Sequence, residues 1–266
     1  MKMADIPAVQ SLFDVSEKVA LITGASGGLG QACAKALAKA GARVMLAGRT
    51  AEKLEPVAQE IRDGGGEVDF VAGQPQDFDD VRRTVEAAVA AFGGVDILVT
   101  AAGLNRVHPI TEFPLEEWDE VMDEVMDVNV KGTWLACREV GRVMIEQGRG
   151  GKVILVSSTR GQLGLGNYSA YCPSKGAVQL LTRTLACEWG KHGINVNAIA
   201  PTVFRTALTQ WMFDDKEFYK NILTRIPIGR LGEPEDFIGT VIFLSSKASD
   251  FMTGAVLYVD GGYTAG

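Results

Sequence analysis

Two hydrophobic patterns alternate along the chain. In short runs almost every position is apolar, whereas in longer stretches apolar residues recur at helical spacing, as in Leu29, Cys33 and Leu37. The first pattern is typical of strands buried on both faces, and the second of helices that bury one face. We predict strands at residues 19–23, 44–47, 68–72, 95–100, 152–157, 194–199 and 255–259.

The order of these elements predicts the fold class. Strand and helix alternate about seven times, which indicates an α/β fold with a doubly wound parallel sheet of about seven strands and helices on both faces. The 266 residues suit a single domain, and no linker rich in Pro, Gly or Ser divides them. We expect an N-terminal extension at 1–14, one domain at 15–266, and a substrate loop or lid at 202–230, where aromatic residues gather.

One short repeat interrupts this regular order. The sequence Asp-Glu-Val-Met at residues 119–122 recurs at once at 123–126. Because four residues turn a helix by about 400°, the second copy returns to nearly the same face. The repeat therefore predicts one extra helical turn that keeps its Val and Met side chains inward.

Composition narrows the function classes. Apolar residues make up 47% and charged residues 22%, as in globular proteins, and the net charge of −7 argues against a nucleic-acid partner. No apolar run approaches the roughly 18 residues of a membrane span, and the polar start of the chain is unlike a secretory signal. Four widely spaced cysteines without a CxxC motif indicate a reduced, cytoplasmic protein without a metal site.

The first predicted strand leads into a glycine-rich turn. Residues 23–30 read Thr-Gly-Ala-Ser-Gly-Gly-Leu-Gly, and a predicted helix follows. Glycines permit a tight turn and let backbone N–H groups approach a pyrophosphate, while the helix N-terminus favours negative charge. The context of strand, turn and helix predicts a Rossmann-like dinucleotide site. Taken alone, the turn is also compatible with an ordinary structural connection.

A tyrosine and a lysine lie about one helical turn apart. Tyr171 and Lys175 begin a long helical stretch and share one face of it. An ammonium beside a phenol favours the phenolate and lowers the pKa of the tyrosine, which suits a general acid or base. The pair occurs often by chance, so its meaning depends on the rest of the chain.

Together these motifs resemble the short-chain dehydrogenase/reductase family over nearly the whole chain. The glycine turn and the tyrosine–lysine pair match the family's motifs in order, and the closing Val-Asp-Gly-Gly at 259–262 matches its tail. Ser158, thirteen residues before the tyrosine, matches the family's serine, and Asn129 matches its asparagine. The resemblance implies a catalytic set of Asn129, Ser158, Tyr171 and Lys175, and a homotetramer.

Three positions depart from the family pattern without removing a member of this set. The Asn-Asn-Ala-Gly after the fourth strand begins here with Thr100, the adenine-side aspartate is Gln74, and the glycine after Pro201 is Thr202. The resemblance also implies a set of cofactor-binding residues. They are Gly24, Ser26, Gly28, Leu29, Gly30, Arg49, Gln74, Ala102, Gly103, Tyr171, Lys175, Phe204 and Thr206.

The activity that the resemblance implies is hydride transfer between a nicotinamide and a carbonyl or alcohol carbon. In reduction, Tyr171 gives a proton to the carbonyl oxygen while Ser158 binds and orients that oxygen. Lys175 lowers the pKa of the tyrosine and holds the nicotinamide ribose. Asn129 holds a water molecule that links Lys175 to solvent.

The end of the second predicted strand bears on the choice of cofactor. An NAD site usually presents a carboxylate to the ribose hydroxyls there, whereas this chain has Gly48 followed by Arg49. A guanidinium forks onto a 2′-phosphate. We therefore predict NADP(H), with NAD(H) as the alternative if Arg49 is only a solvated residue at a helix start.

The substrate is specified least. Residues 103–109 are similar to the loop of the gluconate 5-dehydrogenase-like sugar-acid and polyol dehydrogenases in the family. We expect a small polar or carboxylated substrate that meets Ser158, His108, Arg160 and Trp211. One alternative is a β-ketoacyl-thioester reductase, which the negative net charge disfavours because its carrier is acidic. The other is a catalytically silent nucleotide-binding scaffold.

Overall fold

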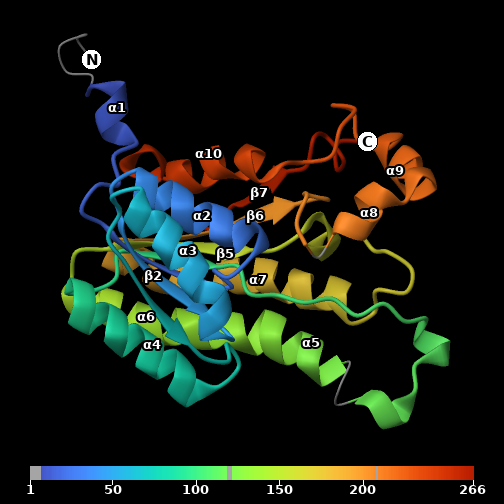
Figure 1. Ribbon diagram of the computed structural model, residues 1–266, viewed down its shortest axis with the longest axis horizontal. Coiled ribbons are helices and arrows are strands. Elements are labelled where there is room, and N and C mark those ends of the chain that lie inside the picture. The colour runs from blue at the N-terminus through green and yellow to red at the C-terminus, as the bar shows by residue number, and fades with distance from the viewer. Residues whose placement is uncertain (1–6, 119–121, 208) are drawn as a thin grey trace.

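Seven parallel strands form one sheet in the residues that this computed structural model describes, which are 7–118, 122–207 and 209–266. Their order across the sheet is β3-β2-β1-β4-β5-β6-β7, and helices pack above and below it (Figure 1). The strands are β1 (Val19–Thr23), β2 (Arg43–Gly48), β3 (Val68–Ala72), β4 (Ile97–Thr100), β5 (Gly151–Val156), β6 (Ile194–Pro201) and β7 (Val256–Val259). The predicted sheet is confirmed, and each strand end lies within two residues of the prediction.

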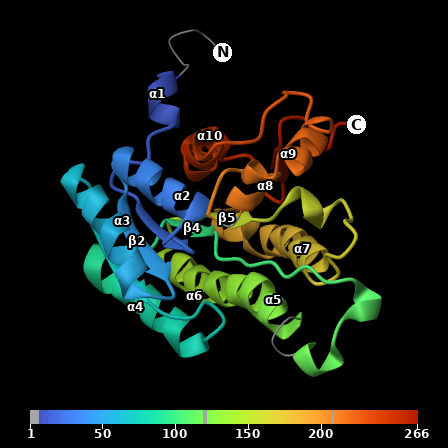
Figure 2. The same ribbon diagram turned by 45° about the vertical axis from the view of Figure 1, so that its right-hand side comes forward.

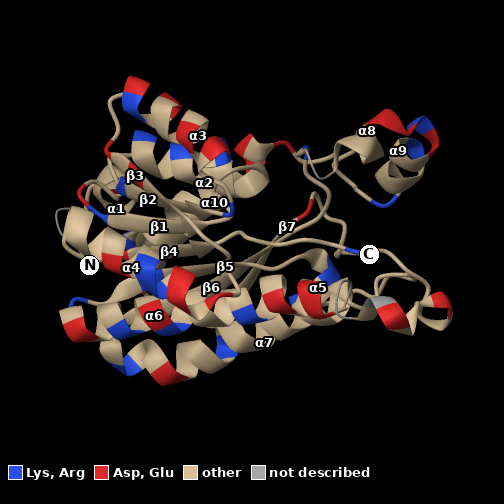
Figure 3. Cartoon of the chain, turned by 60° about the horizontal axis from the view of Figure 1, so that its bottom comes forward, with Lys and Arg blue, Asp and Glu red and all other residues tan. Residues whose placement is uncertain are grey.

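Helices cover both faces of the sheet (Figure 3). One face carries α2 (Gly28–Lys39), α3 (Ala51–Asp63) and α10 (Pro234–Ser245), and the other carries α4 (Phe78–Phe92), α6 (Gly132–Gln147) and α7 (Tyr171–Trp189). The shorter elements are α1 (Val9–Leu12), η2 (Ile110–Glu112), η3 (Leu115–Glu117), α5 (Glu124–Met126), η5 (Asp127–Lys131), η6 (Thr159–Gly161), η7 (Gly190–His192), α8 (Gln210–Asp214), α9 (Lys216–Leu223) and η8 (Lys247–Ser249). This arrangement confirms the predicted doubly wound α/β fold.

Two hydrophobic cores lie on opposite faces of the sheet. Successive side chains of a strand point to opposite faces. Ala20 and Ile22 of β1 therefore join the core under α2, α3 and α10, whereas Leu21 between them joins the core under α4, α6 and α7. Because both faces are covered, the strand is apolar at every one of these positions, which explains the unbroken runs in the sequence.

Two predicted segments lie partly outside the described residues. These are positions 1–6 of the extension and 119–121 of the Asp-Glu-Val-Met repeat. The second copy of the repeat leads through α5 into η5, which is a π-helical turn, and then into α6. A π turn holds one more residue than an α turn and is frequent at functional sites.

The described residues lack two classes of feature. None of their helices is long and apolar enough to cross a membrane, and no group of three His, Cys, Asp or Glu side chains among them is arranged to hold a metal ion. All four cysteines are free. Burial raises the pKa of Cys33 and of Cys137 to about 12, so both thiols stay protonated and act as small apolar side chains.

The turn after β1 approaches the end of β4 too closely for a side chain. Gly24 has a φ of +67°, and a Cβ there would lie 2.5 Å from the Ala102 nitrogen. A Cβ at Gly30, in the first turn of α2, would collide with the carbonyl oxygen of Gly24. These contacts fix the N-terminus of α2 at the edge of the sheet where the strands end.

We expect Gly30→Ala to destabilise the protein by about 1–3 kcal/mol, because the added methyl group overpacks a backbone contact. Thermal melting measures the loss. Gly27→Ala is the matched control, since Gly27 lies in the same turn with extended backbone and no atom within 4 Å of its added Cβ. If the two variants melted at the same temperature, the close approach would not constrain the fold.

Candidate active site

A cavity of about 410 Å³ opens at the carboxyl ends of β1 and β4, where the strand order reverses. Ligands of open α/β sheets bind at this kind of switch point. Most of the residues predicted for the site lie on its wall. They are Gly24, Ser26, Gly28, Leu29, Arg49, Gln74, Ala102, Gly103, Ser158, Tyr171, Lys175, Phe204 and Thr206.

Tyr171 and Lys175 enter this cavity from the start of α7. The Lys175 Nζ lies 5.7 Å from the centroid of the Tyr171 ring and donates a hydrogen bond to the Val156 carbonyl, at 3.0 Å. Burial lowers the pKa of Lys175 to about 8. The two residues therefore share one face of the helix, as their spacing predicted.

The pKa of Tyr171 differs from the sequence expectation of a lowered value. Burial raises it above its usual value, and a hydrogen bond with Ser158 and the positive charge of Arg160 lower it only in part. Lys175 does not offset this burial, because its ammonium faces the ring and the Val156 carbonyl and is itself desolvated. In the protein alone, desolvation thus prevails over charge.

Ser158 follows β5 and caps the short helix η6. Its Oγ accepts a hydrogen bond from the Arg160 N–H at 3.1 Å, and the residue is 7% exposed. The neighbouring Ser157 instead donates to the Lys175 carbonyl at 2.9 Å, which ties β5 to α7. The first serine thus borders the cavity close to Tyr171, and the second fastens the two elements that carry the site.

Asn129 lies behind the cavity wall, in the π turn η5, and is 1% exposed. Its Oδ1 accepts from the Leu104 N–H at 2.9 Å, and its Nδ2 donates to the Leu104 carbonyl and the Ser174 Oγ, both at 3.0 Å. A Cβ on Gly103 would lie 3.3 Å from this Oδ1 and 3.4 Å from the Lys175 Nζ. Asn129 therefore fixes the loop after β4 against the lysine, a contact set that the sequence did not indicate.

The opposite end of the cavity carries a cation. Arg49 is exposed on the wall and makes no ion pair with any residue that the structure describes. A Cβ on Gly48 would lie 3.3 Å from the Ser26 Oγ and 3.1 Å from Leu54. This end thus presents a guanidinium and a hydroxyl. An acidic side chain at position 48 would press on Ser26 and Leu54.

Three of the predicted substrate residues do not line the cavity. The backbone of His108 pairs with the loop at Asn167 and Tyr168, and its ring packs on Phe113. Trp211 packs on Phe218 and is 51% exposed. The guanidinium of Arg160 donates to the Tyr263 hydroxyl at 2.7 Å. Ser158 is the one predicted substrate residue on the wall.

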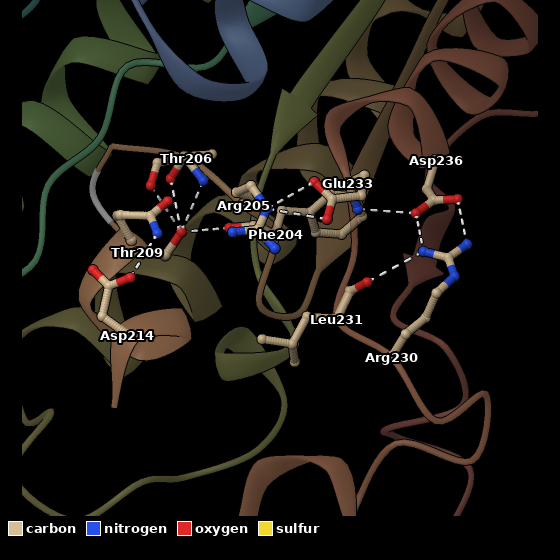
Figure 4. A network of polar contacts seen from close by, with 10 residues as sticks. Phe204, Arg205, Thr206, Thr209, Asp214, Arg230, Leu231, Glu233 and Asp236 are labelled. Carbon is tan, nitrogen blue, oxygen red and sulfur yellow. Dashed lines mark hydrogen bonds and ion pairs between the residues drawn. The ribbon is translucent and has the colours of Figure 1, made fainter. Parts of the chain in front are cut away.

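Ion pairs fasten the 202–230 segment to the N-terminus of α10 (Figure 4). Arg205 meets both carboxylate oxygens of Glu233 at 3.1 and 3.2 Å, and its guanidinium stacks on Phe213 at 3.9 Å. Arg230, at the other end, forks onto Asp236 at 2.5 and 2.7 Å. These pairs hold in place the part of the segment that supplies Phe204 and Thr206 to the cavity wall.

Asp236→Asn should lower the melting temperature at pH 7 by a few degrees, because the Arg230 hydrogen bonds and the Glu233 N–H hold the pKa of Asp236 down at about 2. A folded-state pKa below the unfolded value of about 3.9 stabilises the protein above pH 4, and this contribution disappears as the pH falls toward 2. The difference in melting temperature should shrink over that window.

The control is Asp214→Asn, since among the described residues the Asp214 carboxylate accepts a hydrogen bond only from Gln210, within α8. A pH-independent difference for Asp236→Asn would contradict the assigned electrostatic cause.

Comparison with known proteins gives a consistent set of relatives. A protein-family model described as Enoyl-(Acyl carrier protein) reductase matches residues 24–264. An uncharacterized oxidoreductase of Mycobacterium tuberculosis is 52% identical over 262 residues, which cover 95% of this chain and 93% of the relative. Gluconate 5-dehydrogenase of Gluconobacter oxydans is 39% identical, and the match covers 95% of this chain and 97% of that protein.

A solved structure matches the chain as well. The crystal structure of a gluconate 5-dehydrogenase from Burkholderia cenocepacia, in complex with NADP and tartrate, superposes with a TM-score of 0.91. It is 35% identical, and the match covers 97% of this chain and all of that one. The similarity therefore extends over the whole fold and includes every element that lines the cavity.

Proposed function

The chain belongs to the short-chain dehydrogenase/reductase family, and we propose that it transfers a hydride between NADP(H) and a carbonyl or secondary alcohol of a sugar acid, polyol or keto acid. One observation carries the proposal. Ser158, Tyr171 and Lys175 border one end of a single cavity, and the glycine-rich turn and Arg49 form its other end. The distribution suits a ligand with a reactive ring at one end and phosphates at the other.

The residues present fit a phosphorylated dinucleotide. Gly24 and Ser26 leave room for phosphate at the N-terminus of α2, whose first turn has no acidic residue. Arg49 has no ion pair with any described residue, so its guanidinium is available for a 2′-phosphate. Gly48 presents no carboxylate to the ribose. We assign the remaining cofactor contacts to the wall residues named above.

When bound, the nicotinamide supplies or accepts the hydride. The chain contributes the proton. Tyr171 donates it from its hydroxyl to the substrate oxygen in reduction and takes it back in oxidation, while Ser158 donates a hydrogen bond that orients the same oxygen. Because burial raises the pKa of Tyr171, the phenol is protonated at neutral pH, which is the form that reduction needs.

Lys175 and Asn129 support this proton transfer. With a pKa of about 8, Lys175 carries its proton at pH 7 and loses it at a small cost. We assign it the cofactor ribose and the return of the proton to Tyr171. Asn129, which fixes the loop at Leu104 next to Gly103, is assigned the water that links Lys175 to solvent.

The proposal includes a cytoplasmic homotetramer. Large apolar side chains are exposed on two long helices, Trp134 at 48% on α6 and Leu180 at 62% on α7, and such positions are suited to helix contacts between subunits. Light scattering of the purified protein measures the assembly, and a mass equal to the 28.4 kDa of one chain would contradict it.

A substrate panel separates the candidate functions. Oxidation of NADPH is followed by the absorbance of the reduced nicotinamide, with keto-sugar acids, open-chain ketoses and β-ketoacyl thioesters offered in turn. Turnover of the first two classes supports the proposal. Selective turnover of thioesters would make the chain an acyl-thioester reductase. Binding of NADPH without turnover of any class would leave a nucleotide-binding scaffold.

Tyr171→Phe should reduce kcat at least about tenfold, equivalent to about 1.4 kcal/mol of barrier, since the ring stays and the proton donor is lost. The dissociation constant for NADPH should be nearly unchanged. Tyr168→Phe is the matched control, because its ring packs against Tyr171 at 6.3 Å. Equal rates for the two variants would remove Tyr171 from the acid–base role.

Arg49→Ala should raise KM for NADPH roughly tenfold or more and leave KM for NADH nearly unchanged, because only NADPH has a phosphate for the guanidinium. Steady-state kinetics with both cofactors measure the difference. Arg62→Ala, which removes an exposed arginine paired with Glu55 on α3, is the control. A wild-type preference for NADH, or equal effects of Arg49→Ala on both cofactors, would overturn the assignment.

A further inference from the structure

Tyr263, close to the end of the chain, lies buried between two arginines. It is 1% exposed, and its hydroxyl accepts a hydrogen bond from the Arg160 Nη2 at 2.7 Å. The guanidinium carbons of Arg160 and Arg225 lie 5.2 and 4.7 Å from the centroid of its ring. Neither arginine forms an ion pair within the part of the chain that the structure describes, so the aromatic ring is the shared partner of both cations.

These three residues come from three separate parts of the fold. Arg160 belongs to η6, two residues after Ser158, and Arg225 follows α9 in the 202–230 segment. Tyr263 follows β7, and the C-terminal end of the chain lies near α9 (Figures 1 and 2). Its ring forms a small hydrophobic cluster with Ile222 and Ile226 of the segment. One side chain therefore joins the segment to the turn that carries Ser158.

The backbone before Tyr263 is itself held rigidly. The carboxylate of Asp260 accepts from the N–H groups of Gly262 and Thr264, both at 2.9 Å, and from the Thr264 hydroxyl. The turn also presses directly on the segment, because a Cβ at Gly261 would lie 2.8 Å from the Ile226 Cγ2. Tyr263 is thus presented from a fixed turn and is not a loose tail residue.

We propose that Tyr263 is a positioning residue of the reaction, which holds Arg160 and thereby links the seating of the 202–230 segment to the placement of Ser158 and the charge near Tyr171. The inference rests on the proposed function, since it assigns Tyr171 the proton transfer. Arg160 acts on the site in two ways. Its backbone N–H donates to the Ser158 Oγ at 3.1 Å, and its guanidinium places positive charge near the phenol.

The groups that face Tyr171 define the direction in which its pKa should change. Burial raises its pKa, the Ser158 hydrogen bond lowers it, Cys172 and Tyr168 raise it, and the charge of Arg160 lowers it, while Lys175 lies against the ring. Without the Tyr263 hydroxyl, the Arg160 guanidinium keeps its contact with the ring and, among the described residues, one hydrogen bond, to the Gly164 carbonyl at 3.4 Å. Its charge is then held less firmly and shifts toward solvent, so we expect the pKa of Tyr171 to rise.

The test is Tyr263→Phe, which keeps the ring between the arginines and removes only the hydroxyl. We expect kcat to fall roughly threefold or more, with KM for NADPH unchanged. In alcohol oxidation, which needs the phenolate, the rising limb of the pH profile should move to higher pH. A merely structural role would lower the melting temperature without moving that limb.

Tyr258→Phe is the matched control. The Tyr258 hydroxyl also bonds to the turn after β5, where it donates to Gln162 and not to Arg160. If Tyr263→Phe fails to fold, Arg160→Gln replaces it, because loss of the charge must move the limb in the same direction. The proposal would be overturned if the wild type is active but the pH profile of Tyr263→Phe, or of Arg160→Gln, coincides with that of Tyr258→Phe. The proposed function would remain intact.

A second measurement does not depend on turnover. Hydrogen exchange of peptides covering 158–164 and 216–228 should rise together in Tyr263→Phe and stay at the wild-type level in Tyr258→Phe. If the wild type fails to reduce any substrate of the panel, the proposed function fails. Hydrogen exchange still tests whether Tyr263 couples the 202–230 segment to the turn that carries Ser158. Unchanged exchange at 158–164 in Tyr263→Phe would overturn the link.

Discussion

Close backbone packing at the carboxyl edge of the sheet is the constraint on which the site depends. The turn at Gly24 lies against the backbone of Ala102, so the ends of β1 and β4 stay adjacent. The helices that follow these strands nevertheless cover opposite faces, because α2 and α6 pack into different cores. The connections that leave β1 and β4 therefore separate directly after the contact between Gly24 and Ala102, and the cavity lies in the space between them.

Desolvation sets the acid–base properties of that cavity. Burial moves the pKa of Lys175 down to about 8 and that of Tyr171 up, so each group is driven toward its neutral form. A charge near the phenol is effective in such a site because little water screens it. The position of Arg160, which is set by a residue 103 positions away, thus has consequences for a tyrosine that it does not bond.

The sequence predicted backbone features better than side-chain directions. Short, mostly apolar runs located the strands because both faces of the sheet are covered, and glycine spacing located the turn at Gly24 because only glycine is accommodated there. Charge suggested Arg160 for the substrate, and position in the expected lid suggested Trp211, but each side chain contacts an aromatic partner, far along the chain for Arg160 and on the next helix for Trp211. The π turn around Asn129 was not predicted, since its hydrophobic spacing still reads as helical.

The 202–230 segment contributes to a small hydrophobic cluster besides the two main cores of the sheet. Several of its apolar side chains, with Ile222 and Ile226 among them, cluster around Tyr263, whereas Phe204 belongs to the core under α2, α3 and α10. The ion pairs at its ends, from Arg205 and Arg230, are partly exposed, so solvent screens them and their contribution to stability is modest. A unit with a small core and weak end contacts opens at a lower free energy than the sheet does. Because Tyr263, which packs in this cluster, also holds Arg160, we expect a displacement of these residues to be transmitted to the turn that carries Ser158.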